Sequence, residues 1–287
     1  FIFSKYDLIH IHGCWKISIL FYTFIAKFKK IKIIFSPHGM LDPGSFRYKK
    51  IFKIIFWKLF QKNILKSSDL VITNSNLEKK NIKKILKNKK IEVIPHGIDL
   101  PGIKKKNNLN KNLRFVYFSR IHPIKNLNTL SNIWMQTDFF KKYNLDIYGP
   151  IGNKNYFNSI KKKIKKIQNI NYCGQIYKNK LRKLSEYDIL IHPSHSENFG
   201  LVIIEALSVG LHIILNKNLP WQDLQKKNFA SLINFNSKNL ISTIKFIEKN
   251  KSKIFKKTEL KKKQNYLLNN FAWDKICKNY LFFYKNI

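Results

Sequence analysis

The chain has 287 residues, with 55 Lys and Arg against 16 Asp and Glu, and a formal net charge of +39 at pH 7. This length predicts two domains, each large enough for its own core, and a hydrophobic share of 44% excludes a disordered chain despite the charge. Three widely separated cysteines, Cys14, Cys173 and Cys277, exclude a disulfide framework and a clustered zinc site, which favours a reducing, cytoplasmic setting.

The charge is spread evenly along the chain. Residues 1–103 hold 20 basic and 6 acidic side chains, and residues 104–287 hold 35 and 10, so neither half is a dedicated basic module. The excess is nearly all Lys and is accompanied by abundant Asn, Ile and Phe, as an AT-rich coding sequence would produce. We therefore expect no nucleic-acid partner, although such a surface favours anionic ligands and anionic membrane surfaces.

Short apolar runs alternate with longer Lys-rich segments. Most runs have four to six residues and end in a turn signal such as His12-Gly13 or Gly149-Pro150. Continuous apolar strands separated by helix-length segments predict parallel sheets covered on both faces, and hence an α/β fold. The predicted strands are residues 7–12, 31–35, 70–73, 91–94, 114–119, 145–148, 169–172, 189–192, 212–215 and 231–235.

The linker between the domains is predicted at residues 99–112, where Pro101-Gly102 precedes a polar run of Lys and Asn without periodicity. The predicted parts are residues 1–103, residues 104–270 and a final aromatic helix over residues 271–287. The first domain then has only four strands. Because the chain begins at Phe1 rather than Met, we expect a strand–loop–helix unit to precede it.

Three helical segments have mainly structural interpretations. Ser75 and Glu78 fit a capping box that opens the helix after the strand at 70–73. The segment 49–66 resembles a basic amphipathic helix, but its polar residues are spread around the helical wheel and leave no clean apolar face, so membrane-interface binding is a minority alternative. The longest apolar run, 17–26, is bounded by lysines and is too short to span a bilayer.

The most informative stretch covers residues 187–210, YDILIHPSHSENFGLVIIEALSVG, which predicts a strand, a polar loop and a helix beginning near Gly200. Ligands of open parallel sheets bind where strand C-termini meet helix N-termini, and free N–H groups there favour a phosphate. Glu205 could chelate a ribose diol, because a carboxylate accepts two hydrogen bonds. The alternative is that Glu197 caps the helix and Glu205 is a solvated surface charge.

Two further stretches carry candidate site residues. In FVYFSRIHPIKNLNTL, Arg120 and Lys125 follow a strand and suit a diphosphate, although any pair of cations is weak evidence in so basic a chain. In SPHGMLDPGSF, His38-Gly39 could place an imidazole and a bare backbone at a cleft, or form an ordinary turn. His96 is interpreted as a turn element at the domain junction.

Three motifs are absent from the sequence: an Asp-x-Asp pair at a strand end, a Gly-x-x-x-x-Gly-Lys-Ser/Thr segment, and clustered His and Cys. A site that handles a diphosphate without a metal must neutralise it with Arg, Lys and helix N–H groups. We therefore expect no metal and no cofactor.

These residues carry a family resemblance. Glu197 and Glu205, with seven residues between them in SENFGLVIIEALSVG, and the segment SRIHPIKNL resemble the donor-binding half of retaining glycosyltransferases of family 4. SPHGMLDPGSF, SSDLVITNS and VIPHGID are similar to the N-terminal half of that family, particularly in members that assemble capsule, exopolysaccharide or lipopolysaccharide. The resemblance covers nearly the whole chain. It implies the GT-B fold, in which two Rossmann-like domains face each other and a last helix crosses back to the N-terminal domain.

The resemblance also implies roles for individual residues. Arg120 and Lys125 would hold the donor diphosphate, Glu197 would contact the sugar hydroxyls, Glu205 would hold the ribose, and His38 would lie nearest the acceptor and the reacting centre. The other expected donor contacts are Gly39, Gly149, Gly174, Gln175, Ile176, Asn198, Phe199, Gly200 and Leu201.

We therefore expect a metal-independent glycosyltransferase of surface polysaccharide synthesis. It would move a hexosyl unit, with retention, from a nucleoside-diphosphate sugar to a saccharide or lipid-linked saccharide acceptor. The expected location is the cytoplasm, and the charge is compatible with peripheral contact with the anionic inner face of the membrane. Two alternatives stay open: a GT-B sugar-nucleotide epimerase, which would convert the donor without an acceptor, and a basic nucleic-acid-binding protein, whose binding would be steeply salt-dependent.

Overall fold

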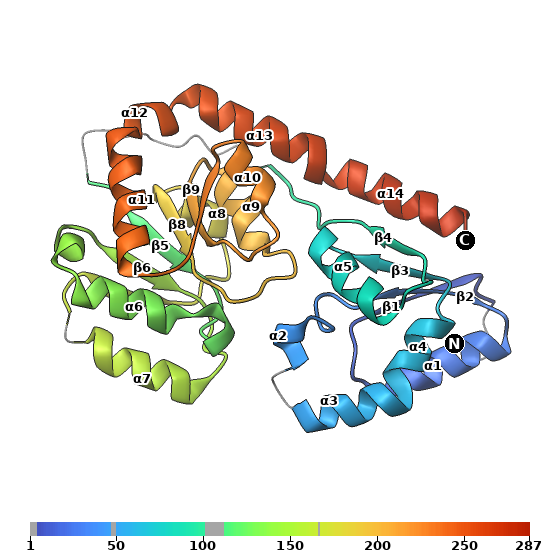
Figure 1. Cartoon of the computed structure of the whole chain (residues 1–287). Helices are drawn as coiled ribbons and strands as arrows, with labels where there is room; N and C mark the ends of the chain where they lie inside the picture. Colours follow the sequence, from blue (N-terminus) through green and yellow to red (C-terminus); the bar gives the residue numbers. More distant parts are fainter. Residues whose placement is uncertain (1–4, 47–49, 101–111, 166) are drawn as a thin grey trace. The chain divides into compact units, whose positions relative to one another are not determined.

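The computed structural model describes residues 5–46, 50–100, 112–165 and 167–287, and Figure 1 shows its helices and strands. The chain forms two compact units. The first unit consists of Phe1–Gly97 with Trp273–Ile287, and the second of Ile98–Ala272. The predicted division between residues 103 and 104 lies outside the described residues.

The first unit is built on a parallel sheet with the strand order β1-β2-β3-β4. Its strands are β1 (Leu8–His12), β2 (Lys32–Ser36), β3 (Leu70–Thr73) and β4 (Ile91–Val93). Its helices are α1 (Ile17–Phe28), α2 (Pro43–Phe46), α3 (Lys50–Phe56), the π-helical segment η1 (Trp57–Gln61), α4 (Lys62–Ser67), α5 (Asn76–Ile85) and α14 (Trp273–Lys285).

The two faces of this sheet carry different helices. Ile33 and Phe35 of β2 belong to a core cluster that includes residues of α1, α4 and α5. Ile34, which points the other way, belongs to a second cluster with Ile276 of α14. Successive side chains of a strand point to opposite faces, so an uninterrupted apolar strand is buried on both.

The C-terminal helix packs on the first unit, as predicted. The predicted start of this helix, residue 271, is wrong, because α14 begins at Trp273. Phe271 is the last residue of α13 (Lys257–Phe271), and Ala272 is extended, which separates α13 from α14. The Phe271 ring packs against Phe199 and Trp221 of the second unit. The chain therefore leaves one core and enters the other across Ala272.

The second unit contains a parallel sheet with the strand order β10-β9-β8-β5-β6-β7. Its strands are β5 (Phe115–Phe118), β6 (Leu145–Tyr148), β7 (Ile170–Gly174), β8 (Ile189–His192), β9 (His212–Asn216) and β10 (Ala230–Ile233). Its helices are η2 (Pro123–Lys125), α6 (Leu127–Gln136), η3 (Asp138–Lys142), α7 (Lys154–Ile164), α8 (Lys180–Leu184), α9 (Leu201–Ser208), α10 (Gln222–Lys226), α11 (Ser237–Lys249), α12 (Lys251–Ile254) and α13.

Helices also cover both faces of this second sheet. Val116 and Leu190 lie in a cluster with residues of α9 and α13, whereas Phe115 and Ile189 lie in a cluster with residues of α6, α7 and α11. The α/β fold class is therefore confirmed in each unit. Strands lie at all ten predicted positions, and their ends coincide with the predicted ones or differ from them by at most two residues. Within the described ranges, every helix falls short of the length or apolarity that a membrane crossing demands.

The strand order marks where a ligand should bind. From β5 the chain adds β6 and β7 on one side, and then β8 returns to the other side of β5. Adjacent strands whose connections run in opposite directions form a crevice at their carboxyl ends, which is where open α/β sheets bind ligands. In this unit the connections change direction between β5 and β8, so a ligand is expected beyond the carboxyl ends of these two strands.

Candidate functional site

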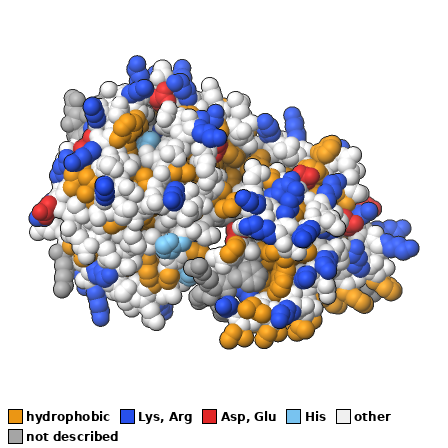
Figure 2. All heavy atoms as spheres, in the orientation of Figure 1, with side chains coloured by type: hydrophobic (Ala, Val, Ile, Leu, Met, Phe, Trp, Pro, Cys, Tyr) orange, Lys and Arg blue, Asp and Glu red, His pale blue; other side chains and the backbone are white. Residues whose placement is uncertain are grey.

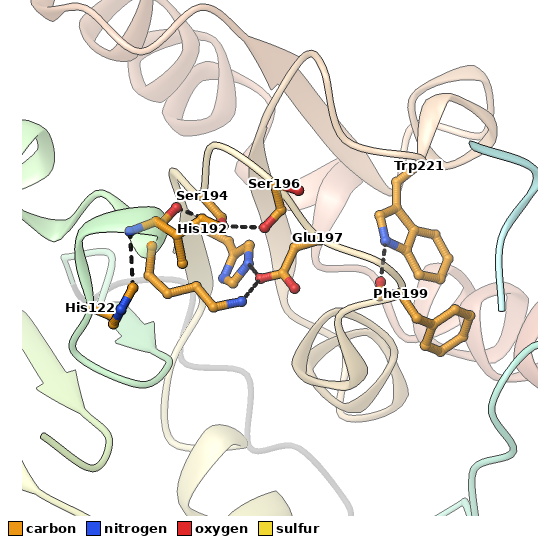
Figure 3. A network of polar contacts seen from close by, with 9 residues as sticks. His122, His192, Ser194, Ser196, Glu197, Phe199 and Trp221 are labelled. Carbon is orange, nitrogen blue, oxygen red and sulfur yellow. Dashed lines mark hydrogen bonds and ion pairs between the residues drawn. The ribbon is translucent and has the colours of Figure 1, made fainter. Parts of the chain in front are cut away.

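The loops that follow β5 and β8 are bonded to each other. The backbone N–H of His195 donates to the carbonyl of Ile124 at 2.9 Å, and the Ser194 hydroxyl donates to the same carbonyl at 3.1 Å. The Asn126 side chain donates to the carbonyl of Pro193 at 3.3 Å. These bonds fix the positions of the side chains that the two loops carry. Figure 3 shows Ser194 between the two loops.

A buried ion pair joins these loops. Lys125, at the end of η2, pairs with Glu197, and their side chains are only 16% and 9% exposed. Nε2 of His192, the last residue of β8, lies 2.6 Å from the same carboxylate (Figure 3). Burial alone would raise the pKa of Glu197, but the hydrogen bond and electrostatic influence of His192, together with the Lys125 ammonium, lower it to about 2. Glu197 is therefore ionised at neutral pH.

The segment after Glu197 forms the start of α9. Gly200 is its N-cap with a φ of +79°, a left-handed conformation that glycine adopts readily. A Cβ at Gly200 would lie 2.9 Å from Cδ1 of Ile203, the end of a side chain that can shift, so the left-handed backbone is the main reason for glycine here. The carbonyl of Phe199 accepts a 2.7 Å bond from Nε1 of Trp221 (Figure 3), and the Phe199 ring is buried. Phe199 therefore anchors the loop in the core, whereas Leu201 is exposed.

Glu205 does not share the cluster around Glu197. It lies in α9 and forms an ion pair with Lys180, the first residue of α8, and the two side chains are 21% and 32% exposed. The Lys180 ammonium also lies 5.0 Å from the centroid of the Phe118 ring. Glu205 is thus a half-buried carboxylate that a cation holds, and not a solvated surface charge. Glu197 does not cap α9 either, because the N-cap is Gly200 and no side chain bonds to it as a cap.

Arg120 follows β5 and is exposed, in contrast to Lys125. Its methylene groups lie over Gly152, where a Cβ would be 2.6 Å from Cγ and Cδ of Arg120. Gly149 at the end of β6 has a φ of +146°, and a Cβ there would lie 1.9 Å from the carbonyl oxygen of Ser119. The close approach of these two backbones requires glycine at residue 149.

The predicted base-contact segment follows β7. The N–H of Gly149 donates to the carbonyl of Gly174 at 2.9 Å, which ties this strand end to the neighbouring one. Gly174 has a φ of +83° and open space at its Cβ position. Gln175 is exposed, and Ile176 packs against the core. All the predicted donor residues of the second unit therefore lie at or beyond the carboxyl ends of β5, β6, β7 and β8.

His38 and Gly39 lie in the first unit, after β2. Both have left-handed backbones, with φ of +52° and +73°. The Gly39 N–H donates to the carboxylate of Glu78 at 2.5 Å, and the Asn74 N–H donates to it at 2.9 Å. Ser75 caps α5 as predicted, because its hydroxyl accepts from the Glu78 N–H at 3.2 Å. The buried Glu78 carboxylate, which accepts from Gly39 and Asn74, fixes the turn that carries His38.

A chain of hydrogen bonds orients the His38 ring. The Asn74 amide donates to the carbonyl of Ile94 at 3.0 Å, so its oxygen faces Nδ1 of His38, 2.8 Å away. A neutral His38 then donates from Nδ1 and accepts at Nε2, where Nδ1 of His12 lies 2.8 Å away. This network assigns the His12 proton to Nδ1 and leaves its Nε2 as an acceptor.

Further imidazoles adjoin this pair. The ring of His38 stacks on His12 and His96, with centroids 5.1 and 5.9 Å apart. The ring centroids of His10 and His12 are 4.0 Å apart, and the His10 ring also forms hydrogen bonds with the hydroxyls of Ser36 and Tyr284. Burial, with the neighbouring histidines, lowers the pKa of His10 to about 3 and also lowers the pKa values of His12 and His96. These three rings are therefore neutral at neutral pH.

Several of these residues were not identified as site residues from the sequence. His192 was placed only at a strand end, yet it is 1% exposed, and its Nδ1 has no hydrogen-bond partner among the described residues. Lys180 and His12 carry no local signal, since one is a lysine in a lysine-rich chain and the other ends a strand. Across the described residues, no group of three or more His, Cys, Asp or Glu side chains is arranged to hold a metal ion.

Two protein-family models match the chain. The model of Glycosyltransferase Family 4 matches residues 2–101, and the model of Glycosyl transferases group 1 matches residues 101–269. A Klebsiella pneumoniae protein, described as an uncharacterized 41.2 kDa protein in the cps region, is 27% identical over 231 residues. That match spans 75% of this chain and 61% of the Klebsiella protein, so the chain corresponds to less than two thirds of that relative.

Solved structures share the architecture. HepE of Anabaena in complex with UDP and glucose matches with a TM-score of 0.78 and 17% identity, over 98% of this chain and 78% of that one. Sucrose-phosphate synthase of Thermosynechococcus elongatus matches with a TM-score of 0.76 and 19% identity, over 98% and 73% of the two chains. At these identities the likeness shows a shared fold, the GT-B fold.

Proposed function

Since the chain belongs to the family of group 1 glycosyl transferases, we propose that it transfers a hexosyl unit, with retention, from a UDP-sugar to a saccharide or lipid-linked saccharide acceptor. The UDP bound to HepE supports the choice of nucleotide. The cps-region relative supports a role in surface polysaccharide synthesis. The three free cysteines support action in a reducing compartment, the cytoplasm.

The observation that carries the proposal is the Lys125–Glu197–His192 cluster at the carboxyl ends of β5 and β8. Lys125 presents a fixed ammonium to a diphosphate, with Arg120 as a second cation on the same loop. Charge that develops on the departing UDP is then stabilised by groups that are already in position. Glu197, held ionised, accepts hydrogen bonds from sugar hydroxyls. This arrangement neutralises the diphosphate without a metal.

Glu205 is proposed to bind the ribose. Its carboxylate is held by Lys180 in the ligand-free chain, and a carboxylate has enough lone pairs to keep that cation while it accepts two hydroxyl bonds. Backbone N–H groups at the start of α9 complete the diphosphate site.

In the first unit, the His12–His38 pair is proposed to receive the acceptor sugar. Nε2 of His12 accepts a hydrogen bond from the acceptor hydroxyl and orients it, and the departing phosphate takes the proton as the new bond forms on the same face. His12 is thus a positioning residue, and its tautomer is set by His38 and Asn74.

A donor panel tests the proposal. UDP and UDP-hexoses should raise the melting temperature more than other nucleotides do, because ligands that bind only the native state stabilise it. EDTA should leave transfer intact, whereas Lys125→Met should lower it by about 10²–10³-fold. Lys161→Met, at an exposed lysine of α7, is the matched control. Conversion of the donor without an acceptor would instead identify an epimerase, and a strict Mg²⁺ or Mn²⁺ requirement would refute the site.

A further inference from the structure

The second unit contains a cavity at the edge of its sheet opposite to the candidate donor site. The cavity has a volume of about 680 Å³, which is in the range of sites that hold small molecules. Its lining includes His212 at the start of β9 and Ser231 near the start of β10, together with residues of α11, α12 and α13. Because the strands are parallel, their amino ends lie at the edge opposite to Lys125 and Glu197. The cavity is therefore separate from the proposed donor site.

The lining of this cavity is polar and carries a net positive charge. Among the described lining residues are five asparagines and three lysines, whereas Glu259 is the only acidic residue in this set. Glu259 forms an ion pair of 2.6 Å with Lys262, so the net charge comes from the other two lysines. A ligand with negative charge and several hydroxyl groups matches such a lining. The asparagines are Asn228, Asn250, Asn265, Asn269 and Asn270, and the lysines are Lys227, Lys253 and Lys262.

Hydrogen bonds fix two of these asparagine side chains. The Asn250 amide donates to the carbonyl of Phe246 at 2.9 Å, and the Asn270 amide donates to the carbonyl of Tyr266 at 2.8 Å. The side-chain oxygen of each asparagine keeps its lone pairs for a donor such as a sugar hydroxyl. These acceptors are held in place before a ligand arrives, which reduces the entropy that binding costs.

Two aromatic rings also line the cavity. Phe246 of α11 is 59% exposed. Tyr266 of α13 is held in place, because its ring centroid lies 5.9 Å from that of Phe229 and its hydroxyl donates to Asp223. The Lys227 ammonium lies 5.6 Å from the centroid of the Tyr266 ring. Figure 2 shows this side of the second unit, where hydrophobic and lysine side chains lie among uncharged ones over α11, α12 and α13. An aromatic face packs against the C–H groups of a sugar ring, and a neighbouring cation attracts a carboxylate on that ring.

His212 adds a buried polar group to the lining. It is 3% exposed, and its Nε2 lies 2.9 Å from the Ser231 hydroxyl. Its Nδ1 has no hydrogen-bond partner among the described residues. Buried polar atoms of native proteins are rarely left unpaired, so an unpaired one is typical of a place where a ligand or water binds.

We infer that this cavity is a second saccharide site, which binds a segment of an acidic saccharide chain. Lys227 and Lys253 attract its carboxylates, the asparagines bond to its hydroxyls, and Phe246 and Tyr266 pack against its rings. The choice of a saccharide rests on the proposed function, whereas the cavity and its charge do not. A second contact with the chain on which a transferase acts raises the effective concentration of that chain at the enzyme.

The experiment is calorimetric titration at about 0.15 M salt, where weak contacts with scattered surface lysines are screened. The ligands are tetragalacturonate, which is an acidic saccharide, the neutral maltotetraose, and inorganic tetraphosphate. Tetragalacturonate should bind most tightly, and saturating UDP should not displace it. Equal binding of maltotetraose or of tetraphosphate would overturn the inference, because the site would then not recognise an acidic saccharide. Displacement by UDP would overturn it too, since the saccharide would then occupy the donor site.

Variants locate the binding. Phe246→Gln should weaken tetragalacturonate binding by about tenfold, and Lys253→Gln by about two- to fivefold. The matched controls are Leu268→Gln, at a side chain of α13 that is 48% exposed, and Lys161→Gln on α7; both residues lie outside the lining. All four replaced side chains are exposed, so the variants should keep their melting temperatures, which scanning calorimetry checks. Equal affinity of the cavity variants and the controls would refute the second saccharide site.

UDP binding, measured on the same variants, separates this inference from the proposed transfer reaction. The cavity variants should bind UDP as the unchanged protein does. A protein that binds tetragalacturonate in the cavity but does not bind UDP would refute only the transferase proposal. The reverse result would refute only the second saccharide site.

Discussion

Replacing Lys125 by methionine removes the cation from a buried carboxylate without removing its bulk. The pKa of Glu197 is lowered from 4.5 to about 2 in the folded chain, and this difference corresponds to about 3 kcal/mol. This stabilisation is fully present at a pH above the pKa of Glu197 in the unfolded chain, and it is lost as the pH falls through the pKa of Glu197 in the folded chain. Lys125 and His192 both contribute to this stabilisation, so we expect Lys125→Met to lower the free energy of unfolding by about 1–3 kcal/mol at pH 7.

A double-mutant cycle with Glu197→Gln measures the interaction. In a unit of this size, each kcal/mol lowers the melting temperature by about 2–4 °C. Glu197→Gln should remove most of the penalty of Lys125→Met, because no buried carboxylate is then left without its cation. The difference in stability between wild type and Lys125→Met should also shrink as the pH falls from about 4.5 towards 2, since Glu197 becomes protonated. Lys161→Met should show no coupling with Glu197→Gln.

Calorimetry and urea unfolding from pH 7 to pH 3 provide both measurements. If the costs of the two single changes add within about 0.5 kcal/mol, the residues do not interact in the folded chain. A cost of Lys125→Met that is constant over this pH range would refute the electrostatic explanation in the same way.

Three further outcomes are expected. Gly149→Ala should destabilise the chain by more than about 3 kcal/mol, because its Cβ would overlap the Ser119 carbonyl. Gly174→Ala should destabilise it by only about 1–2 kcal/mol, because only the left-handed φ opposes a side chain there. Similar urea midpoints for the two variants would contradict this difference. Glu205→Gln should weaken UDP binding in calorimetry, whereas an unchanged affinity would remove Glu205 from the ribose site. His12→Ala should lower turnover by about 10²-fold at unchanged UDP affinity, and full turnover would exclude its positioning role.

The sequence by itself determined the class of fold. Uninterrupted apolar runs such as the strand at 189–192 can be buried only in a sheet covered on both faces, and this requirement is local. It also located the candidate donor site, because strand ends followed by helix starts can be recognised along the chain. Gly200 and the start of α9 are such a case, since a left-handed N-cap restricts the residue type.

The tertiary structure decided which of these residues interact. Lys125 and Glu197 are 72 residues apart, and their contact depends on β8 lying beside β5, which local pattern does not encode. Lys180, rather than another of the many lysines, holds Glu205 for the same reason. The start of α14 was misjudged because Ala272 is extended only between two separate cores.

The buried side of α1 also depends on tertiary structure. A helix that is apolar on every side has no periodicity to show which side is buried. The sheet takes the side with Ile19 and Ala26, and the opposite side remains exposed because no other element of the described chain covers it. Packing, and not composition, therefore decides which side of α1 belongs to the core of the first unit.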